Sequence, residues 1–161
     1  MRKLILVLTG LIILLTVNFN IYQREKLRSE GREVLLELAP VDPRSLMQGD
    51  YMALRFKVAT DAFPNWHTEQ QSQDGLLVVL VDERNVAHFK RLVDNMPLAA
   101  NEVVLQYRIR DNEVKFATNA FFFEEGRGES YQVARYGEFR VSAQGEMLLI
   151  NLRGADLAIL N

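Results

Sequence analysis

The longest run of apolar residues lies at the N-terminus of the chain. From Leu4 to Ile21 no residue is charged, and the strongly polar positions are Thr9, Thr16, Asn18 and Asn20. In a helix, about 18 residues span about 27 Å, which is close to the thickness of a bilayer's hydrocarbon core. No charged residue gives this segment a hydrated face, so a buried helix of a soluble domain is disfavoured. The pattern predicts a transmembrane helix.

This stretch has two interpretations, an uncleaved signal anchor and a cleaved signal peptide. A signal peptide also begins with basic residues, here Arg2 and Lys3, before its apolar core. However, residues 16–20 offer no small-x-small cleavage site, which favours the signal anchor. The polar residues 22–32 include good helix formers and no proline, so we expect the helix to continue as a stalk until Gly31.

Beyond the stalk, apolar and polar residues alternate in short runs. Such alternation with a period of two is typical of half-buried β-strands. We expect strands at Val34–Leu38, Asp50–Val58, Gly75–Asp82, Val86–Val93, Val103–Arg110, Glu113–Ala117, Gly137–Ser142 and Met147–Arg153. Residues 59–74 lack this period and predict a loop or a short irregular helix, and Ser130–Tyr136 can form a short helix.

These elements predict a mainly β fold, with an N-terminal transmembrane helix followed by an antiparallel β-barrel or sandwich with one short helix. The length of 161 residues fits one domain plus an anchor. We therefore expect residues 1–32 to form a signal-anchor transmembrane helix and stalk. Residues 33–161 are expected to form an extracytoplasmic β domain.

Turn-forming residues are densest just before the second expected strand. Pro40 and Pro43 fix φ and lack an amide donor, so this segment is neither helix interior nor central strand. Asp42 can cap a helical turn that starts at Pro43, and Gly49 can end it because glycine tolerates positive φ. The segment thus predicts a compact turn that leads into a strand.

From Asp50 onward, every second residue from Met52 to Val58 is apolar, which places Asp50 on the core-facing side of the expected strand. A buried carboxylate needs donors, and Arg44 in the preceding turn is a charged donor close to it in sequence. Asp42, Arg44 and Asp50 therefore have two interpretations. They form a structural clasp that closes one end of the barrel, or they form a recognition site.

Two blocks of the sequence resemble the GDYXXLXY family of small membrane-anchored bacterial proteins. The first block reads Gly49-Asp50-Tyr51-Met52-Ala53-Leu54-Arg55-Phe56, with Phe56 in place of the last tyrosine. The second is the aromatic run Phe121–Phe123, followed by Glu124-Glu125-Gly126. The family usually has a proline where this chain has Glu124, whereas Glu125 and Gly126 match.

The resemblance implies no biochemical activity, because none is assigned to the family. Similar proteins tend to be encoded beside polytopic membrane proteins, which implies an integral membrane protein as partner. The candidate binding residues that the resemblance and the turn chemistry single out are Asp42, Pro43, Arg44, Gly49, Asp50, Tyr51, Leu54, Phe56, Glu125 and Gly126.

Composition narrows the chemistry further. The chain has no cysteine, which excludes disulfides, thiol catalysis and cysteine–metal sites. His67 and His88 are too far apart in sequence for a metal-binding motif, so no metal is expected. Gly126-x-Gly128 is typical of a turn and not of a phosphate-binding loop, so no cofactor is expected. A formal net charge of −2 without a basic cluster argues against nucleic acid as a partner.

An alternative function is a membrane-tethered hydrolase that resembles a signal peptidase. Such an enzyme needs a serine nucleophile near a lysine base, and the available pairs are Ser45 with Lys57 or Lys90. Ser45 lies in Pro-Arg-Ser-Leu-Met, which is not the Ser-Met-x-Pro context that this resemblance demands. We therefore assign no catalytic residue. Trp66 and His67 could contact a ligand, or Trp66 could cover the end of the core.

The expected location is the bacterial inner membrane, with a single span and the C-terminal domain in the periplasm. Arg2 and Lys3 favour a cytoplasmic N-terminus, whereas the basic residues within 24–32 favour the opposite orientation. We expect the N-terminus inside, because one N-terminal anchor followed by one compact domain is the usual arrangement of exported proteins.

Overall fold

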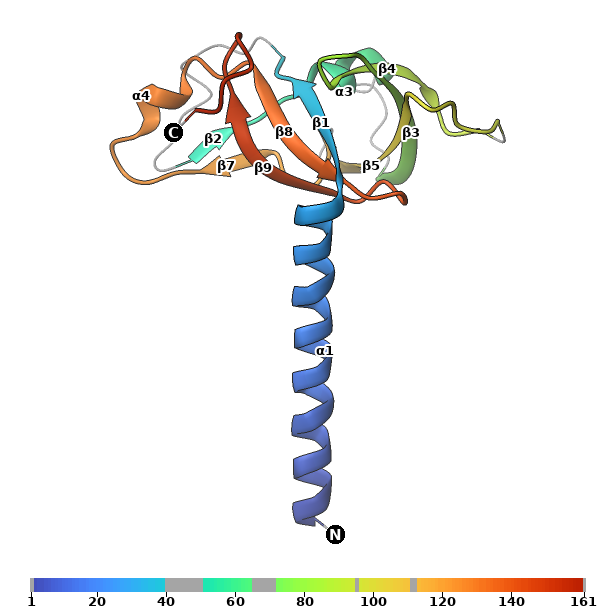
Figure 1. Cartoon of the computed structure of the whole chain (residues 1–161), viewed down its shortest axis with the longest axis vertical. Helices are drawn as coiled ribbons and strands as arrows, with labels where there is room; N and C mark the ends of the chain where they lie inside the picture. The colour runs from blue at the N-terminus through green and yellow to red at the C-terminus, as the bar shows by residue number, and fades with distance from the viewer. Residues whose placement is uncertain (1, 40–50, 65–71, 95, 111–112, 161) are drawn as a thin grey trace.

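The computed structural model of the protein describes residues 2–39, 51–64, 72–94, 96–110 and 113–160. A single long helix, α1 (Arg2–Glu30), projects from a β-rich head (Figure 1). The helix ends where the sequence predicts, and the Gly31 amide donates to the Leu27 carbonyl at 3.0 Å. Leu27 is the buried residue of α1, and it lies at the end of the helix next to the head.

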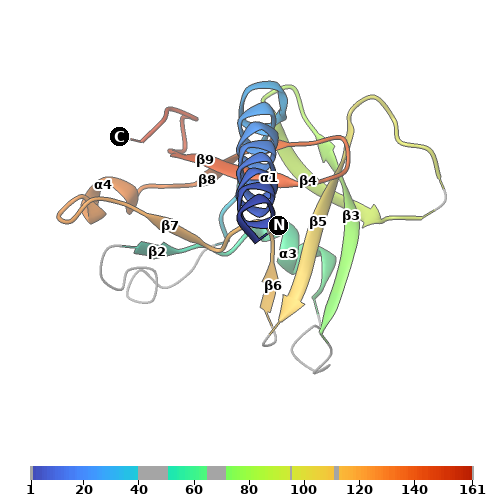
Figure 2. The same ribbon diagram turned by 90° about the horizontal axis from the view of Figure 1, so that it is seen from below.

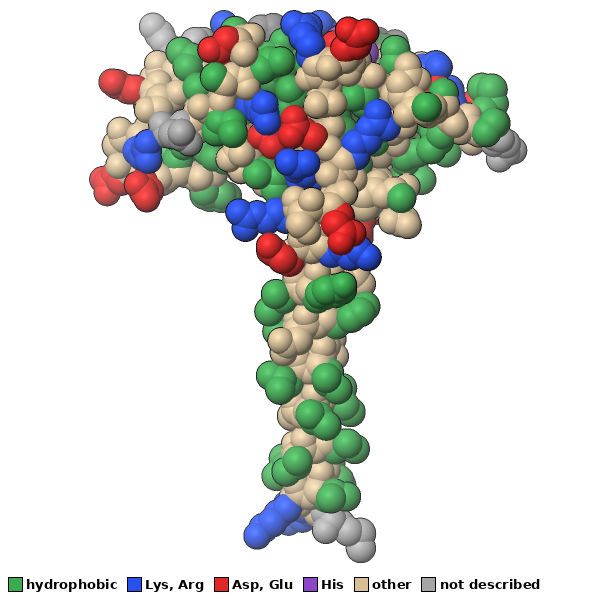
Figure 3. Space-filling view, viewed as in Figure 1, with side chains coloured by type: hydrophobic (Ala, Val, Ile, Leu, Met, Phe, Trp, Pro, Cys, Tyr) green, Lys and Arg blue, Asp and Glu red, His purple; other side chains and the backbone are tan. Residues whose placement is uncertain are grey.

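Helix α1 is long and apolar enough to cross a membrane by its length and composition. Its apolar side chains are exposed all along the shaft, and charged side chains cluster at both of its ends (Figure 3). This distribution is the one that a bilayer-spanning helix requires, because its centre meets hydrocarbon and its ends meet water.

The head consists of one curled seven-stranded sheet, which forms a half-barrel, and a small two-stranded sheet (Figures 1 and 2). The strand order of the large sheet is β6-β5-β3-β4-β1-β8-β9. Its strands are β1 (Arg32–Glu37), β3 (Gln73–Val81), β4 (Val86–Leu92), β5 (Glu102–Arg110), β6 (Glu113–Lys115), β8 (Tyr136–Val141) and β9 (Met147–Arg153). The predicted mainly β fold class is confirmed.

The large sheet is mixed and not wholly antiparallel. Strand β1 pairs in parallel with β4, with Leu35 opposite Val86, and antiparallel with β8. Parallel neighbours need a long connection, and among the described residues β2 (Tyr51–Ala53), helix α3 (Lys57–Ala62) and β3 lie between β1 and β4 in the sequence. The alternation of residues predicts which segments are strands, but it carries no information about the direction in which distant strands pair.

The second expected strand is shorter than predicted. Strand β2 (Tyr51–Ala53) ends after three residues, and helix α3 (Lys57–Ala62) follows. The expectation that the strand runs to Val58 is therefore wrong, although Met52 and Val58 are both buried as the alternation requires. The alternation persists because apolar residues of the helix also face the core, so period two alone does not separate a strand from a first helical turn.

The core lies inside the curved sheet, and Phe56 is at its centre. Phe56 is 2% exposed, and its ring meets Phe139 at 5.4 Å and Phe116 at 5.8 Å, both edge to face. The family motif has tyrosine at this position. A tyrosine here would bring a hydroxyl group into this apolar cluster and would need a hydrogen-bond partner.

Candidate functional site

The two sequence blocks meet in the small sheet. Strand β2 pairs antiparallel with β7 (Ala120–Phe122), so that Tyr51 lies opposite Phe122 and Met52 opposite Phe121. The short helix α4 (Gly128–Tyr131) follows β7 and packs beside it. We call β2, β7 and α4 the signature lobe, and it forms one end of the head (Figure 1).

The inner face of the signature lobe is an aromatic cluster. Tyr131 is 8% exposed and packs against Phe121 at 5.1 Å and against Phe123 at 5.3 Å. Met52, which is buried, lies opposite Phe121 on the same side of the sheet. Successive side chains of β7 point to opposite faces, so Phe121 packs into the aromatic cluster and Phe122 points outward.

The outer face of the signature lobe carries an aromatic pair. The rings of Tyr51 and Phe122 lie 5.7 Å apart at 42°, and Phe122 is 74% exposed. A phenylalanine exposed to this extent gains little stability from folding, since most of its ring stays in water. The motif tyrosine is thus placed beside one of the most exposed aromatic side chains of the head.

The tip of the signature lobe is charged. Glu124, Glu125 and Arg127 are exposed, and the Arg127 guanidinium lies 4.0 Å from the Glu124 carboxylate. Gly126 has φ of +83°, which explains why a glycine stands in this turn. The carboxylate of Glu125 forms no hydrogen bond or ion pair with the part of the chain that the structure describes.

The remaining motif residues separate into two groups. Leu54 and Phe56 are 1% and 2% exposed, so they contribute to the core and not to a surface. Asp42, Pro43, Arg44, Gly49 and Asp50 lie outside the described residues, as do Ser45, Trp66 and His67. The structure thus brings Tyr51 to the end of β7 that leads to Glu125 and Gly126.

Asn119 joins the two blocks, and sequence reasoning did not single it out. Its carbonyl accepts from the Leu54 amide at 2.7 Å. Its side chain accepts from the Phe116 amide and donates to the Val114 carbonyl, both at 3.2 Å. One asparagine in the β6–β7 connection therefore satisfies backbone groups of the motif segment and of the segment leading to the second block.

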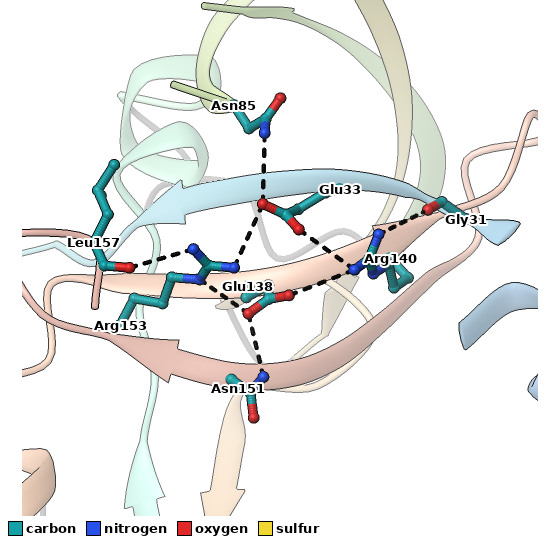
Figure 4. Close-up of polar contacts among 8 residues, drawn as sticks. All are labelled: Gly31, Glu33, Asn85, Glu138, Arg140, Asn151, Arg153 and Leu157. Carbon is teal, nitrogen blue, oxygen red and sulfur yellow. Dashed lines mark hydrogen bonds and ion pairs between the residues drawn. The ribbon is translucent and has the colours of Figure 1, made fainter. Parts of the chain in front are cut away.

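A second feature that sequence reasoning missed is a charged cluster on the outer face of β1, β8 and β9 (Figure 4). Glu138 is only 3% exposed. Its carboxylate accepts from Arg153 at 2.9 Å and from Asn151 at 3.2 Å. Burial raises the pKa of Glu138, but these hydrogen bonds and the charges of Arg153 and Arg140 outweigh it and leave the pKa below its usual value.

The same cluster ties helix α1 to the sheet. Arg140 lies 3.4 Å from the Glu33 carboxylate and also donates to the Gly31 carbonyl at 3.4 Å. Arg153 reaches Glu33 at 3.4 Å and the Leu157 carbonyl at 3.2 Å. The cluster connects the end of the helix, three strands and the C-terminal tail. We interpret its role as structural, since it holds the helix against the sheet.

Another buried carboxylate holds the β4–β5 loop. Glu102 accepts from Lys90, from Arg91 at 3.1 Å and from the Ala99 amide at 3.2 Å. The hydrogen bond from Lys90 is the main reason that the pKa of Glu102 is lowered. The end of β4 and the loop that follows it expose large apolar side chains, among them those of Leu92, Val93, Met96 and Leu98.

The two lysines considered as catalytic bases are engaged in ion pairs. Lys57 donates to Glu37 at 3.1 Å, and this hydrogen bond raises the pKa of Lys57. Lys90 is bound to Glu102, and His88 lies 3.6 Å from Asp82. Within the described ranges, no group of three or more histidine, aspartate or glutamate side chains is arranged to hold a metal ion.

Comparison with protein families gives one finding. A model described as GDYXXLXY protein matches residues 13–152, which include most of α1 and nearly the whole head. A comparison with curated proteins and one with solved structures each give no match.

Proposed function

Because the chain belongs to the GDYXXLXY protein family, we propose that it is a membrane-anchored, extracytoplasmic β domain that recognises a polytopic integral membrane protein. The proposal has three parts, which are anchoring by α1, exposure of the head outside the cytoplasm, and recognition through the signature lobe.

Anchoring rests on α1. Its apolar shaft, from Leu4 to Ile21, is exposed to the surroundings of the protein along its whole length. A free helix of this kind in water would expose many apolar side chains at a cost of about 25 cal/mol per Å². Insertion into a bilayer removes this cost, and Arg2 and Lys3 then lie at the cytoplasmic surface of the inner membrane.

The observation that carries the recognition part is the exposed aromatic pair of Tyr51 and Phe122. Exposed aromatic side chains held on a rigid backbone are typical anchors of protein interfaces. Here the two strands of the lobe and the packing of Tyr131 fix the pair in place. Glu125 at the tip adds a charge that a partner can pair with.

The test compares two exposed apolar residues of the head. Phe122→Ser removes the aromatic anchor, and Val133→Ser is the matched control, because Val133 is 60% exposed and Phe122 74%. Tagged full-length protein is purified from detergent-solubilised native membranes, and co-purified membrane proteins are quantified by mass spectrometry.

We expect Phe122→Ser to weaken capture of a polytopic membrane protein at least about 30-fold, because truncating an anchor aromatic costs about 2 kcal/mol or more. Val133→Ser should retain capture. Equal recovery of the membrane protein with the two variants would show that the signature lobe is not part of the interface. No enrichment of any polytopic protein by the unaltered chain would contradict the proposed function.

The hydrolase alternative receives less support. A lysine that acts as general base needs a pKa below its usual value. Lys57 has the opposite shift because of Glu37, and Lys90 is bound to Glu102. We expect no labelling of the purified protein by a fluorophosphonate probe, and stoichiometric labelling at Ser45 would favour the hydrolase instead.

A further inference from the structure

The large sheet has an open edge at β9. Strand β9 pairs with β8 on one side, and its other side is covered near its C-terminal end by the tail of the chain. There the Leu160 amide donates to the Leu152 carbonyl at 3.0 Å, and Ile159 forms a bridge with Arg153. In the part of the chain that the structure describes, no strand pairs with the edge from Met147 to Ile150.

The hydrogen-bond pattern shows which main-chain groups face this edge. The Ser142 amide donates to the Glu146 carbonyl at 2.9 Å across the β8–β9 turn. In an antiparallel pair the bonded positions alternate, so the next position, Met147, directs its N–H and C=O away from β8. Two residues further on, Leu149 does the same. The ladder then shifts its register by one residue between Phe139 and Glu138 of β8, so beyond this shift the Leu152 carbonyl again faces outward, where it accepts from the Leu160 amide.

A cavity of about 630 Å³ runs beside these groups. Met147, Leu148 and Leu149 form one wall, and residues 116–118, which follow β6, line it as well. Arg24 of α1 and Arg108 of β5 also line the cavity. We call this space the β9 slot. The segment Met147–Ile150 has no charge and no proline, although exposed edges of natural sheets usually carry such protection.

The chemistry of the β9 slot selects its occupant. Main-chain donors and acceptors at every second residue are matched by another extended chain, which adds to the sheet as a strand. The charged side chains of the lining also favour a particular kind of strand. Asp74 is bound by Arg110 at 2.6 Å, whereas Arg24 and Arg108 form no ion pair with any described residue. Because Arg110 neutralises Asp74, the lining keeps the charges of Arg24 and Arg108 against the single carboxylate of Glu146.

The position of the β9 slot indicates that the added strand belongs to a membrane protein. Arg24 lies three residues beyond Ile21, so it is about 4.5 Å along the helix from the end of the apolar shaft. Figure 1 shows β9 crossing the side of the head from which α1 departs. A segment that leaves the membrane beside α1 meets the slot first.

We propose that the edge of β9 takes up an extended segment of the integral membrane partner as an added β-strand, with an acidic side chain of that segment bound by Arg24 and Arg108. This inference rests on the proposed function and names the surface by which the partner is held close to the membrane. It is separate from the aromatic pair of the signature lobe.

The main test removes one outward amide and leaves the ladder with β8 intact. Leu149→Pro has this effect, because proline is tolerated at edge positions whose N–H points outward. Leu149→Ala is its matched control, since it loses the same partly buried side chain but keeps the N–H. Both are placed in full-length protein with a photoreactive benzoyl-phenylalanine at position 117, an exposed residue of the slot, and crosslinked in native membranes.

We expect position 117 to crosslink to a segment of a polytopic membrane protein, and Leu149→Pro to lower the yield about fivefold relative to Leu149→Ala. Equal yields in the two variants, with unchanged circular dichroism, would overturn the proposal. A crosslink to a soluble protein or to a second copy of this chain would overturn it as well.

A second pair of variants keeps the test decisive if Leu149→Pro does not fold. Arg108→Glu should lower the yield, while Arg135→Glu, an exposed arginine outside the slot, should not. A photoreactive residue at position 122 separates the two proposals. Capture of the membrane protein at 122 but not at 117 would contradict only the β9 slot, and capture at neither position would contradict the proposed function itself.

Discussion

At the scale of single residues, the charged cluster around Glu138 links the stability of the head to pH. A buried carboxylate is costly unless it is paired and hydrogen-bonded, and here Arg153, Arg140 and Asn151 supply the partners. Because these partners favour the charged form, the pKa of Glu138 is lower in the folded chain than in the unfolded one. The cluster therefore makes stability depend on pH.

We predict that Glu138→Gln makes the free energy of unfolding less dependent on pH in the acid range. A lowered folded pKa means that the carboxylate contributes its full stability above its usual value of 4.5, and that this contribution is lost as the pH falls toward the folded pKa. The variant should be less stable by about 1–3 kcal/mol at neutral pH and nearer to the unaltered chain in acid. Urea unfolding at pH 3–7 measures this, and identical pH slopes would contradict it.

The sequence predicts which residues of a strand are buried, but it does not predict which distant residues form ion pairs. Alternation placed Met52, Leu54 and Phe56 on the core-facing side, because burial on one face of a strand is a local property. The cluster depends on contacts between distant residues, such as Arg153 with Glu33, which are 120 positions apart. A single sequence does not show which outward-facing charges will meet.

At the scale of elements, the junction between α1 and β1 determines how the head is held on the helix. Gly31 separates the two elements without a loop. A Cβ at this position would lie 2.4 Å from the Leu27 carbonyl oxygen and 3.0 Å from the Arg140 Cβ. The glycine is therefore required by close approach of the backbone.

We predict that Gly31→Ala lowers the free energy of unfolding of the head by about 1–3 kcal/mol, because the end of α1 must shift and weaken the bond from Arg140 to Gly31. Gly10→Ala is the control, since nothing lies within 4 Å of a Cβ there. Thermal unfolding in detergent measures both variants. A Gly31→Ala variant as stable as Gly10→Ala would contradict this description of the junction.

Elements were predicted better than their ends and directions. The predicted strands β3, β4, β8 and β9 are confirmed, because each needs only local alternation. They pair as two hairpins, β3 with β4 and β8 with β9. The switch from β2 to α3 was missed, since Val58 and its neighbours suit either a strand or a helix. The parallel pairing of β1 with β4 was missed because it depends on the assembled sheet.

At the scale of the whole molecule, we predict that residues 33–161 fold without the anchor. Their core is formed within the head, by residues such as Leu77, Leu105 and Phe139. Circular dichroism of this fragment should show a β-rich spectrum with little helix, and the fragment should unfold in one cooperative step. A spectrum dominated by helix, or an insoluble fragment, would contradict a head that folds independently.

We propose that α1 anchors the chain in the membrane and that the head lies outside the cytoplasm, and single-cysteine labelling tests both points. The chain has no cysteine, so single cysteines report on one position each. His88→Cys lies at an exposed position of the head, and Arg2→Cys at the other end of α1. Intact cells are treated with a membrane-impermeant maleimide before and after lysis.

We expect His88→Cys to be labelled in intact cells and Arg2→Cys to be labelled only after lysis, with both proteins retained in carbonate-washed membranes. Labelling of Arg2→Cys and protection of His88→Cys in intact cells would place the head in the cytoplasm. Release of the chain by carbonate, or a mature N-terminus after α1, would contradict the anchor itself.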